Sequence, residues 1–122
     1  MKYLILIHGN QLNWEGWTEE QKIAFGRAHF ALSDRLLDSG ELVHGEGLAD
    51  PSLAASVSVR GGRTMTTDGP YPEAKEHLAG FYLVECSRER AIEIAAEVPD
   101  ALYGTVEVRP VLDHSAHRAH EM

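Results

Sequence analysis

The chain has 122 residues, 43% of them apolar and 25% charged, which is the balance of one soluble globular domain. Its formal net charge of −8 disfavours a nucleic-acid backbone or an anionic membrane as the main partner, because neither would be attracted. The longest apolar runs are too short to span a bilayer. The single cysteine, Cys86, excludes an internal disulfide, so we expect a cytoplasmic protein.

The first two predicted elements are a strand and a long helix. Residues 2–8, KYLILIH, predict a strand that is apolar on both faces. A capping box formed by Thr18 and Gln21 begins the helix, and Gly40 ends it after about residue 39. The helix carries two apolar stripes, Phe25, Leu32 and Leu36 in one and Ile23, Phe30 and Leu37 in the other. A strip of four residues lies between the stripes, namely Lys22, Gly26, His29 and Ser33.

The middle of the chain predicts a strand and a hairpin. In chain order we expect a strand over residues 41–48, a turn at 50–51, a strand over 55–60 with Val57 and Val59 inward, a two-glycine turn at 61–62 and a return strand over 63–67. A polar loop over residues 68–77, bracketed by two prolines, follows the hairpin.

The last third predicts a strand, a helix and a strand. The strand covers residues 78–86, and the helix runs from its cap at Ser87 to about Val98, with Ile92, Ala95 and Val98 on its apolar side. Residues 105–111 alternate valines with Glu107 and Arg109. We therefore expect one domain over residues 1–112 and a disordered tail over 113–122.

This element order predicts the fold. Strand–helix–strand, hairpin, strand–helix–strand gives a ferredoxin-like α+β sandwich, in which an antiparallel sheet carries two helices on one face. The strands are apolar on both faces, but helices cover only one. We expect the other face to pack against the same face of a second copy, which makes a homodimer.

The segment TDGPYPEAKEHLAGFYLVE, residues 67–85, resembles the DGPF-motif proteins of the YCII-related family. The family signature is an Asp-Gly-Pro-aromatic loop followed by Glu, Lys-Glu and a Gly-Phe-Tyr strand. MKYLILIHG, GEGL and VEVRPV fit the same family, so the resemblance covers nearly the whole chain. It implies the dimeric α/β-barrel superfamily, in which two ferredoxin-like domains pair.

The resemblance also implies a histidine–aspartate pair, and one relative of the wider group is an aromatic-ring dehydrochlorinase. The family histidine stands eleven residues before the glycine that ends the first helix, which is the place of His29 here. The family aspartate precedes a proline after the second helix. Here Val98 precedes Pro99, and Glu97 and Asp100 flank the two, so the carboxylate partner stays open. DGPF-type proteins also resemble accessory partners of alternative sigma factors.

Candidate site residues come from the helix, the loop and the strands. His29 is the expected base, and Asp68 and Glu73 are the expected acidic groups of the rigid loop, where Asp68 also has a turn-forming reason to be present. The residues expected to bind substrate are His8, Lys75, Tyr82 and Arg109, of which Tyr82 and Arg109 alternate toward the same region.

Other sites are weaker predictions. His8, His44 and Glu46 would make a two-histidine, one-carboxylate metal site if their strands are neighbours, and His114, His117 and His120 are spaced by three. Nothing in either spacing demands a metal, so we expect none. Trp14 and Trp17 are lid or dimer-anchor candidates. Cys86, beside a helix N-terminus, is either activated or structural.

Two functions fit these residues. The first is a small enzyme that needs no organic cofactor and moves a proton on a small metabolite, as an isomerase or lyase does. The second is a non-catalytic ligand-binding or regulatory dimer.

Overall fold

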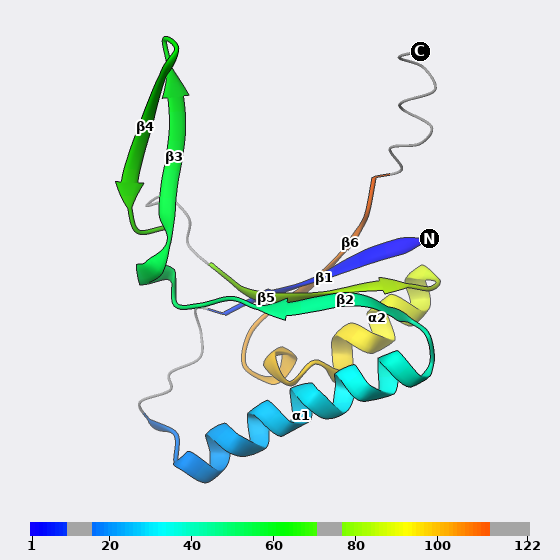
Figure 1. The fold of residues 1–122 in the computed structure, drawn as a ribbon. Coiled ribbons are helices and arrows are strands. Elements are labelled where there is room, and N and C mark those ends of the chain that lie inside the picture. Colours follow the sequence, from blue (N-terminus) through cyan, green and yellow to red (C-terminus); the bar gives the residue numbers. More distant parts are fainter. Residues whose placement is uncertain (10–15, 71–76, 113–122) are drawn as a thin grey trace, which may run out of the picture.

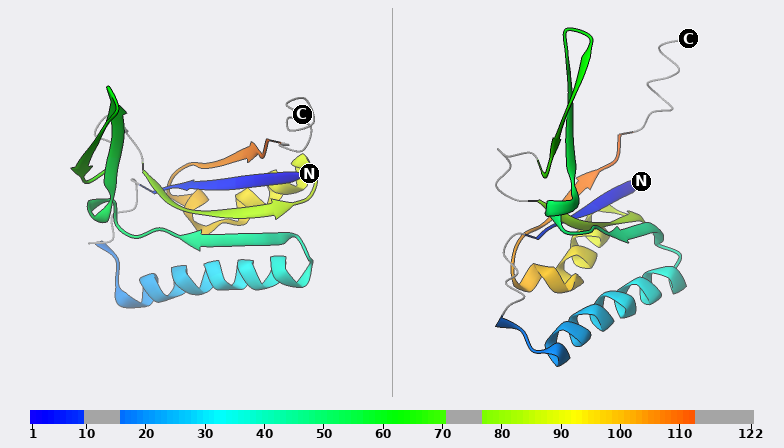
Figure 2. Two further views of the ribbon diagram at one scale, coloured as in Figure 1. Left: turned by 45° about the horizontal axis from the view of Figure 1, so that its top comes forward. Right: turned by 60° about the vertical axis from the view of Figure 1, so that its left-hand side comes forward.

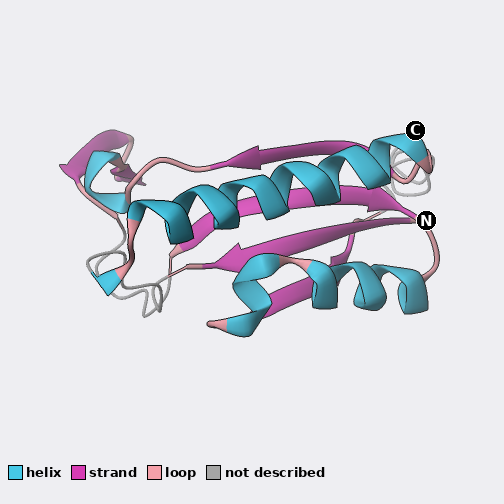
Figure 3. Ribbon diagram, turned by 90° about the horizontal axis from the view of Figure 1, so that it is seen from below, coloured by secondary structure: helices cyan, strands magenta, loops and turns pink. Residues whose placement is uncertain are grey.

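The computed structural model describes residues 1–9, 16–70 and 77–112. It contains a four-stranded antiparallel sheet in the order β2-β5-β1-β6, with both α-helices on one face (Figure 1, Figure 3). The sheet strands are β1 (Lys2–His8), β2 (Leu42–Gly47), β5 (Leu78–Glu85) and β6 (Val106–Pro110). The helices are α1 (Glu19–Asp38) and α2 (Arg88–Glu97), with short 3-10 turns η2 (Pro51–Leu53) and η3 (Pro99–Leu102). This is the predicted ferredoxin-like sandwich.

The core lies between the sheet and the two helices. Ile5 of β1 and Val84 of β5 are fully buried, and α2 presents Ala91, Ile94, Ala95 and the adjoining Val98 to them. The predicted apolar side of α2 was partly wrong, because Ile92 is 44% exposed. Positions three and four apart share a helix face, and the set that includes residues 91, 94, 95 and 98 is the one the sheet covers.

Helix α1 begins at its predicted capping box. The Thr18 hydroxyl accepts from the Gln21 N–H at 3.1 Å, and the Gln21 side chain accepts from the Thr18 N–H at 2.8 Å. Leu32 and Leu36 of the first stripe are buried, as predicted. The second stripe was expected inside and is exposed, with Ile23, Phe30 and Leu37 at 53%, 74% and 59%. The sheet lies on one side of α1, so only one stripe can pack on it (Figure 3).

The hairpin stands apart from the sheet. Its strands β3 (Ala55–Arg60) and β4 (Arg63–Asp68) are joined by Gly61 and Gly62, whose φ angles of 56° and 77° suit a tight hairpin turn. The hairpin projects from the sheet on the side away from the helices (Figure 1, Figure 2). Val57 and Val59 were expected to point inward but are 62% and 58% exposed, because no described layer covers this two-stranded ribbon.

The face of the sheet opposite the helices has an apolar centre and charged margins. Leu4 pairs with Leu83 and Leu6 with Phe81, so these four side chains share that face. No described helix covers it (Figure 2). This is the face that the predicted homodimer would bury. Neither α1 nor α2, the helices of the described part, is long and apolar enough to cross a membrane.

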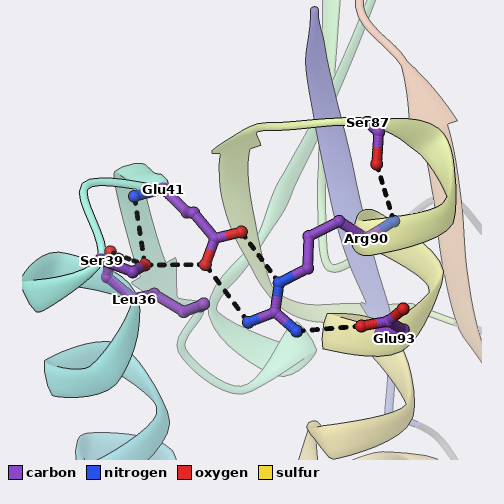
Figure 4. A network of polar contacts seen from close by, with 6 residues as sticks. All are labelled: Leu36, Ser39, Glu41, Ser87, Arg90 and Glu93. Carbon is purple, nitrogen blue, oxygen red and sulfur yellow. Dashed lines mark hydrogen bonds and ion pairs between the residues drawn. The ribbon is translucent and has the colours of Figure 1, made fainter.

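A charged network ties the end of α1 to α2 (Figure 4). Arg90 of α2 donates two hydrogen bonds to Glu41, from Nε at 2.8 Å and from Nη2 at 3.2 Å, and a third to Glu93 at 3.2 Å. The Ser39 hydroxyl donates to Glu41 at 2.7 Å. These bonds lower the pKa of the Glu41 carboxyl, with Arg90 as the largest cause. The network therefore holds the α1–β2 corner against the first turn of α2.

Candidate functional site

His29 is the centre of a hydrogen-bonded group drawn from three elements. Its Nε2 lies 2.6 Å from Oδ1 of Asp100 in η3, and its Nδ1 lies 2.6 Å from the hydroxyl of Tyr82 in β5. The imidazole also stacks against the Tyr82 ring, with a centroid separation of 6.0 Å and an interplanar angle of 11°. We call Asp100, His29 and Tyr82 the His29 triad.

Asp100 is the one buried polar or charged residue in the described part of the chain. Pro99 begins the 3-10 turn directly before it, and the Asp100 carbonyl accepts from the N–H groups of Tyr103 and Gly104. A buried carboxylate costs several kcal/mol unless a donor compensates it, and His29 supplies that donor. The 3-10 turn after α2 thus places the Asp100 carboxylate against His29 of α1.

Tyr82 reaches His29 from the helix-facing side of the sheet. Gly45 of β2 is its register partner, and a Cβ built on Gly45 would lie only 3.1 Å from Cδ1 of the Tyr82 ring. Burial raises the pKa of the Tyr82 hydroxyl, the Asp100 charge adds to this, and a hydrogen bond with Ser33 opposes it. Tyr82 therefore carries its proton at neutral pH and acts as a donor.

The two partners of His29 bear on its tautomer. With an ionised Asp100, which can only accept, a neutral imidazole carries its hydrogen on Nε2. The lone pair of Nδ1 then faces the Tyr82 hydroxyl, which donates to it. In this arrangement His29 can accept a proton at Nδ1, and Asp100 would stabilise the resulting cation.

The structure resolves the open question of the carboxylate partner. Of the two acids that flank Val98 and Pro99, Asp100 bonds His29, whereas Glu97 is exposed at the end of α2. The pair is separated by 71 residues, so spacing alone does not reveal it. The flanking proline was the only signal for Asp100 in the sequence. Ser33 was part of the polar strip, but its bond to Tyr82 was not predicted.

Of the two acids predicted in the loop, only Asp68 lies in the described part of the chain, and it is not part of this group. Asp68 ends β4 in the projecting hairpin, where it is exposed. None of the contacts in the described residues joins it to the triad. Glu73 and Lys75 lie outside the described residues, so their predicted roles stay predictions.

His8 and Arg109 lie on the other face of the sheet. Ile5 pairs with Tyr82, whereas the neighbouring Leu4 pairs with Arg109, so Tyr82 and Arg109 point to opposite faces. The expectation that those two side chains share a region was wrong. His8 and Arg109 both contact Glu107, at 3.0 Å and 2.6 Å, and His8 is the larger cause of the lowered pKa of that carboxyl.

The histidines of β1 and β2 do not converge. Strand β5 lies between β1 and β2, so His8 and His44 are two strands apart, contrary to the neighbour relation that a shared metal site requires. His44 instead lies 3.3 Å from Glu46. Across residues 1–9, 16–70 and 77–112, no three His, Cys, Asp or Glu side chains form a group that could hold a metal. The three histidines of the tail lie outside those ranges.

A cavity of about 440 Å³ lies between the N-terminal half of α1 and η3. Three aromatic rings border it, with centroid separations of 5.4 Å for Trp17–Phe25 and 5.1 Å for Trp17–Tyr103. Phe25 also lies edge-on to His29 at 5.1 Å. Trp17 thus packs within its own chain, while Trp14 lies outside the described residues.

Cys86 does not have the character of a reactive thiol. Burial and the nearby Glu41 carboxylate raise its pKa, and the effect of Arg90 in the opposite direction is smaller. A raised pKa means less thiolate at neutral pH, which favours the structural interpretation of this cysteine.

The sheet, the two helices on one face and the pairing of His29 with the buried Asp100 carboxylate define a ferredoxin-like α+β protein with a candidate acid–base site. The chain belongs to the YCII-related domain family, whose family model matches residues 1–115. It is also similar to the uncharacterised protein R00369 of Rhizobium meliloti (strain 1021), with 31% identity over 114 residues that cover 91% of this chain and 92% of that protein. The predicted family is confirmed.

Proposed function

We propose that this protein is a small enzyme that transfers a proton on a small metabolite, in the manner of an isomerase or lyase. One observation carries the proposal: both nitrogens of His29 lie 2.6 Å from a partner, a buried carboxylate on one side and a phenol on the other. A carboxylate that orients an imidazole, which in turn faces a hydroxyl, is the arrangement of a general base and its relay. No step requires an organic cofactor.

The proton would move in two linked transfers. The Tyr82 hydroxyl proton passes to Nδ1 of His29 as the Tyr82 oxygen takes a proton from carbon or oxygen of the substrate. The imidazolium is then held by the charge of Asp100, and the proton returns by the same route to another atom of the substrate. Every proton that leaves the substrate is therefore stored on the triad and given back, so no outside acid or base is consumed.

The raised pKa of Tyr82 supports this order of events. A buried phenol keeps its proton until a base removes it, and the hydrogen bond from Ser33 stabilises the partial negative charge on the Tyr82 oxygen during the exchange of protons. Lys75 and Arg109 are the two cationic residues predicted to bind substrate, and Lys75 is the one proposed to hold an anionic group. Arg109 is not proposed for that role, because it bonds Glu107 on the opposite face of the sheet.

Hydrogen exchange tests the proposal. Wild-type protein would be incubated in D2O with small carbonyl and phenolic metabolites, and deuterium incorporation at carbon would be followed by NMR. We expect incorporation with the wild type, and a loss of about 100-fold or more with His29→Gln and Asp100→Asn, since general acid–base catalysis contributes about that factor. Glu97→Gln is the matched control and should retain the rate. Folded wild-type protein that exchanges no candidate above the buffer rate would refute the proposal.

One observation favours the second candidate, a ligand-binding or regulatory dimer. Every buried side-chain nitrogen or oxygen in the described part already has a hydrogen-bond partner, and the triad satisfies itself without a ligand. If His29→Gln weakens ligand binding and no variant changes a turnover rate, the binding role is correct. An accessory role beside a sigma factor would be a special case of it.

We further propose that either function is carried out by a cytoplasmic homodimer. The support is the helix-free sheet face with Leu4, Leu6, Phe81 and Leu83 at its centre, since an apolar sheet face is commonly covered by another layer.

A further inference from the structure

The cavity between α1 and η3 is distinct from the His29 triad. Its volume of about 440 Å³ is in the range of small-molecule sites in proteins, and residues of α1, of η3 and of the segment before α1 border it. None of the three triad residues lines it. The cavity and the triad are adjacent, because Phe25 lines the cavity and meets the His29 ring edge-on, with 5.1 Å between the ring centroids.

Three aromatic rings form one corner of the cavity. Trp17 meets Phe25 at 87° and Tyr103 at 59°, and Phe25 meets Tyr103 at 57°, with centroid separations between 5.1 and 6.3 Å. Aromatic rings at such separations prefer offset-stacked or edge-to-face contacts. Because the three rings are inclined to one another, a further flat ring can stack on one of them and meet another edge-on.

The rest of the lining is uncharged. Ala28 of α1 and Pro99 and Leu102 of η3 supply apolar surface. Among the described residues that border the cavity none carries a charged side chain, and the amide oxygen of Gln21 already accepts from the Thr18 N–H. A charged ligand would lose its hydration in this cavity without gaining a partner of opposite charge, which is unfavourable. The lining therefore selects uncharged molecules.

The apolar surface around the cavity is incompletely covered. Leu102 is 83% exposed and Tyr103 is 48% exposed, although η3 packs against α1. Removing such side chains from water is favourable, and exposed apolar groups that are gathered in one place are typical of binding sites. Both residues line the cavity, so a ligand there would cover part of this surface.

We propose that the cavity between α1 and η3 is a small-molecule binding site, separate from the His29 triad, and that its ligand is an uncharged, flat ring compound. The uncharged character follows from the lining, and the flat ring follows from the three inclined aromatic side chains. This site does not depend on the proposed proton transfer, because the ligand would contact Phe25 and Pro99 and not the triad residues.

Binding of indole tests the site. Indole is flat and uncharged, and indole-3-carboxylate has the same two rings with a negative charge. Protein labelled with 15N would be titrated with each compound, and dissociation constants would come from the shifts of the backbone N–H signals of Phe25, Ala28 and Tyr103.

Two variants of α1 make a matched pair for this titration. Ala28→Phe fills the cavity from its α1 wall. Ala31→Phe is the control, because residue 31 is exposed on the same helix and does not line the cavity. Thermal melting of each variant checks that it folds.

We expect the wild type to bind indole with a dissociation constant of about a millimolar or lower, and Ala31→Phe to agree within about twofold. Ala28→Phe should bind about tenfold more weakly or worse, because the new ring occupies the space of the probe. The wild type should bind indole-3-carboxylate about tenfold more weakly than indole. His29→Gln should bind indole within about twofold of the wild type, since the imidazole lies outside the cavity.

Four results would overturn the inference. The first is a wild type without saturable shifts in millimolar indole, and the second is an Ala28→Phe variant that binds as tightly as Ala31→Phe. The third is a loss of binding in His29→Gln as large as that in Ala28→Phe, which would place the ligand at the triad. The fourth is equal binding of indole-3-carboxylate, which would contradict the selection of uncharged molecules.

The test is independent of the proposed function. None of these measurements involves proton exchange, so the expected binding would stand even if the wild type exchanged no substrate proton. Conversely, exchange that depends on His29 would stand even if indole did not bind.

Discussion

His29 owes its environment to residues that are 53 and 71 positions away in the chain. The polar strip on the first helix made it a candidate, because a histidine between apolar stripes needs hydrogen-bond partners. The family resemblance left Glu97 and Asp100 as the alternatives for the carboxylate partner, and nothing in the sequence indicated Tyr82 as the other partner. The turn η3 after the second helix and the central strand β5 both had to lie next to α1. Only then could Asp100 and Tyr82 form hydrogen bonds with the two nitrogens of His29.

The raised pKa of Tyr82 predicts a loss of stability in alkali. The unfolded chain releases the tyrosine proton near the ordinary value of 10.0, whereas the native state holds it to a higher pH. Above about pH 10 the unfolded state therefore binds fewer protons, and the free energy of unfolding falls as pH rises. Below that value the contribution is fully present.

Tyr82→Phe removes the titrating group, so the variant should lack this part of the alkaline decline. Urea unfolding at several values between about pH 8 and pH 11 should show the wild type converging on the variant. Parallel curves for the two proteins across that range would contradict the buried, hydrogen-bonded phenol.

At the scale of elements, local signals placed the helices well. The capping box at Thr18, the cap at Ser87 and the positive φ of Gly40 all act within one turn of the chain, so the sequence contains them completely. The sequence predicted less well which face of each element would be buried. Val57 and Val59 alternate as a buried strand would, yet the hairpin has no described layer to pack on.

The Glu41–Arg90 contact predicts how firmly two elements are joined. Glu41→Gln should lower the free energy of unfolding by about 1 kcal/mol at neutral pH, because a bidentate charged hydrogen bond between α1–β2 and α2 is lost. Glu93→Gln is the matched control, since Glu93 makes a single bond to Arg90 and is more exposed; its cost should be about half or less.

The same contact has a pH dependence. The pKa of Glu41 is lowered in the native state, so its contribution is present above the ordinary value of 4.5 and disappears as pH falls through the lower native value. Chemical unfolding at about pH 7 and pH 3 should therefore show a smaller difference between wild type and Glu41→Gln in acid. An undiminished difference would mean that the charge of Glu41 is not the cause.

At the scale of the whole molecule, the uncovered sheet face is the main open feature. The homodimer remains a prediction, and light scattering at micromolar concentration tests it. We expect twice the 13.5 kDa of one chain for the wild type. Leu83→Lys should have the mass of a monomer, because the substitution puts a charge at the centre of the apolar face. Phe30→Lys is the control at an exposed apolar residue of α1 and should leave the mass unchanged.

A wild type that stays a single folded chain at that concentration would refute the dimer. The His29 triad lies on the helix side of the sheet and would be unaffected by this result.

The sequence by itself determined the order of the elements, their caps and turns, and the family, because these depend on residues that are close together in the chain. The tertiary structure alone decided which carboxylate meets His29, that Tyr82 and Arg109 face opposite sides, and that β5 separates His8 from His44. The physical reason is that strand order and register bring distant residues together, and a shift of one residue in register reverses the face of every side chain on a strand.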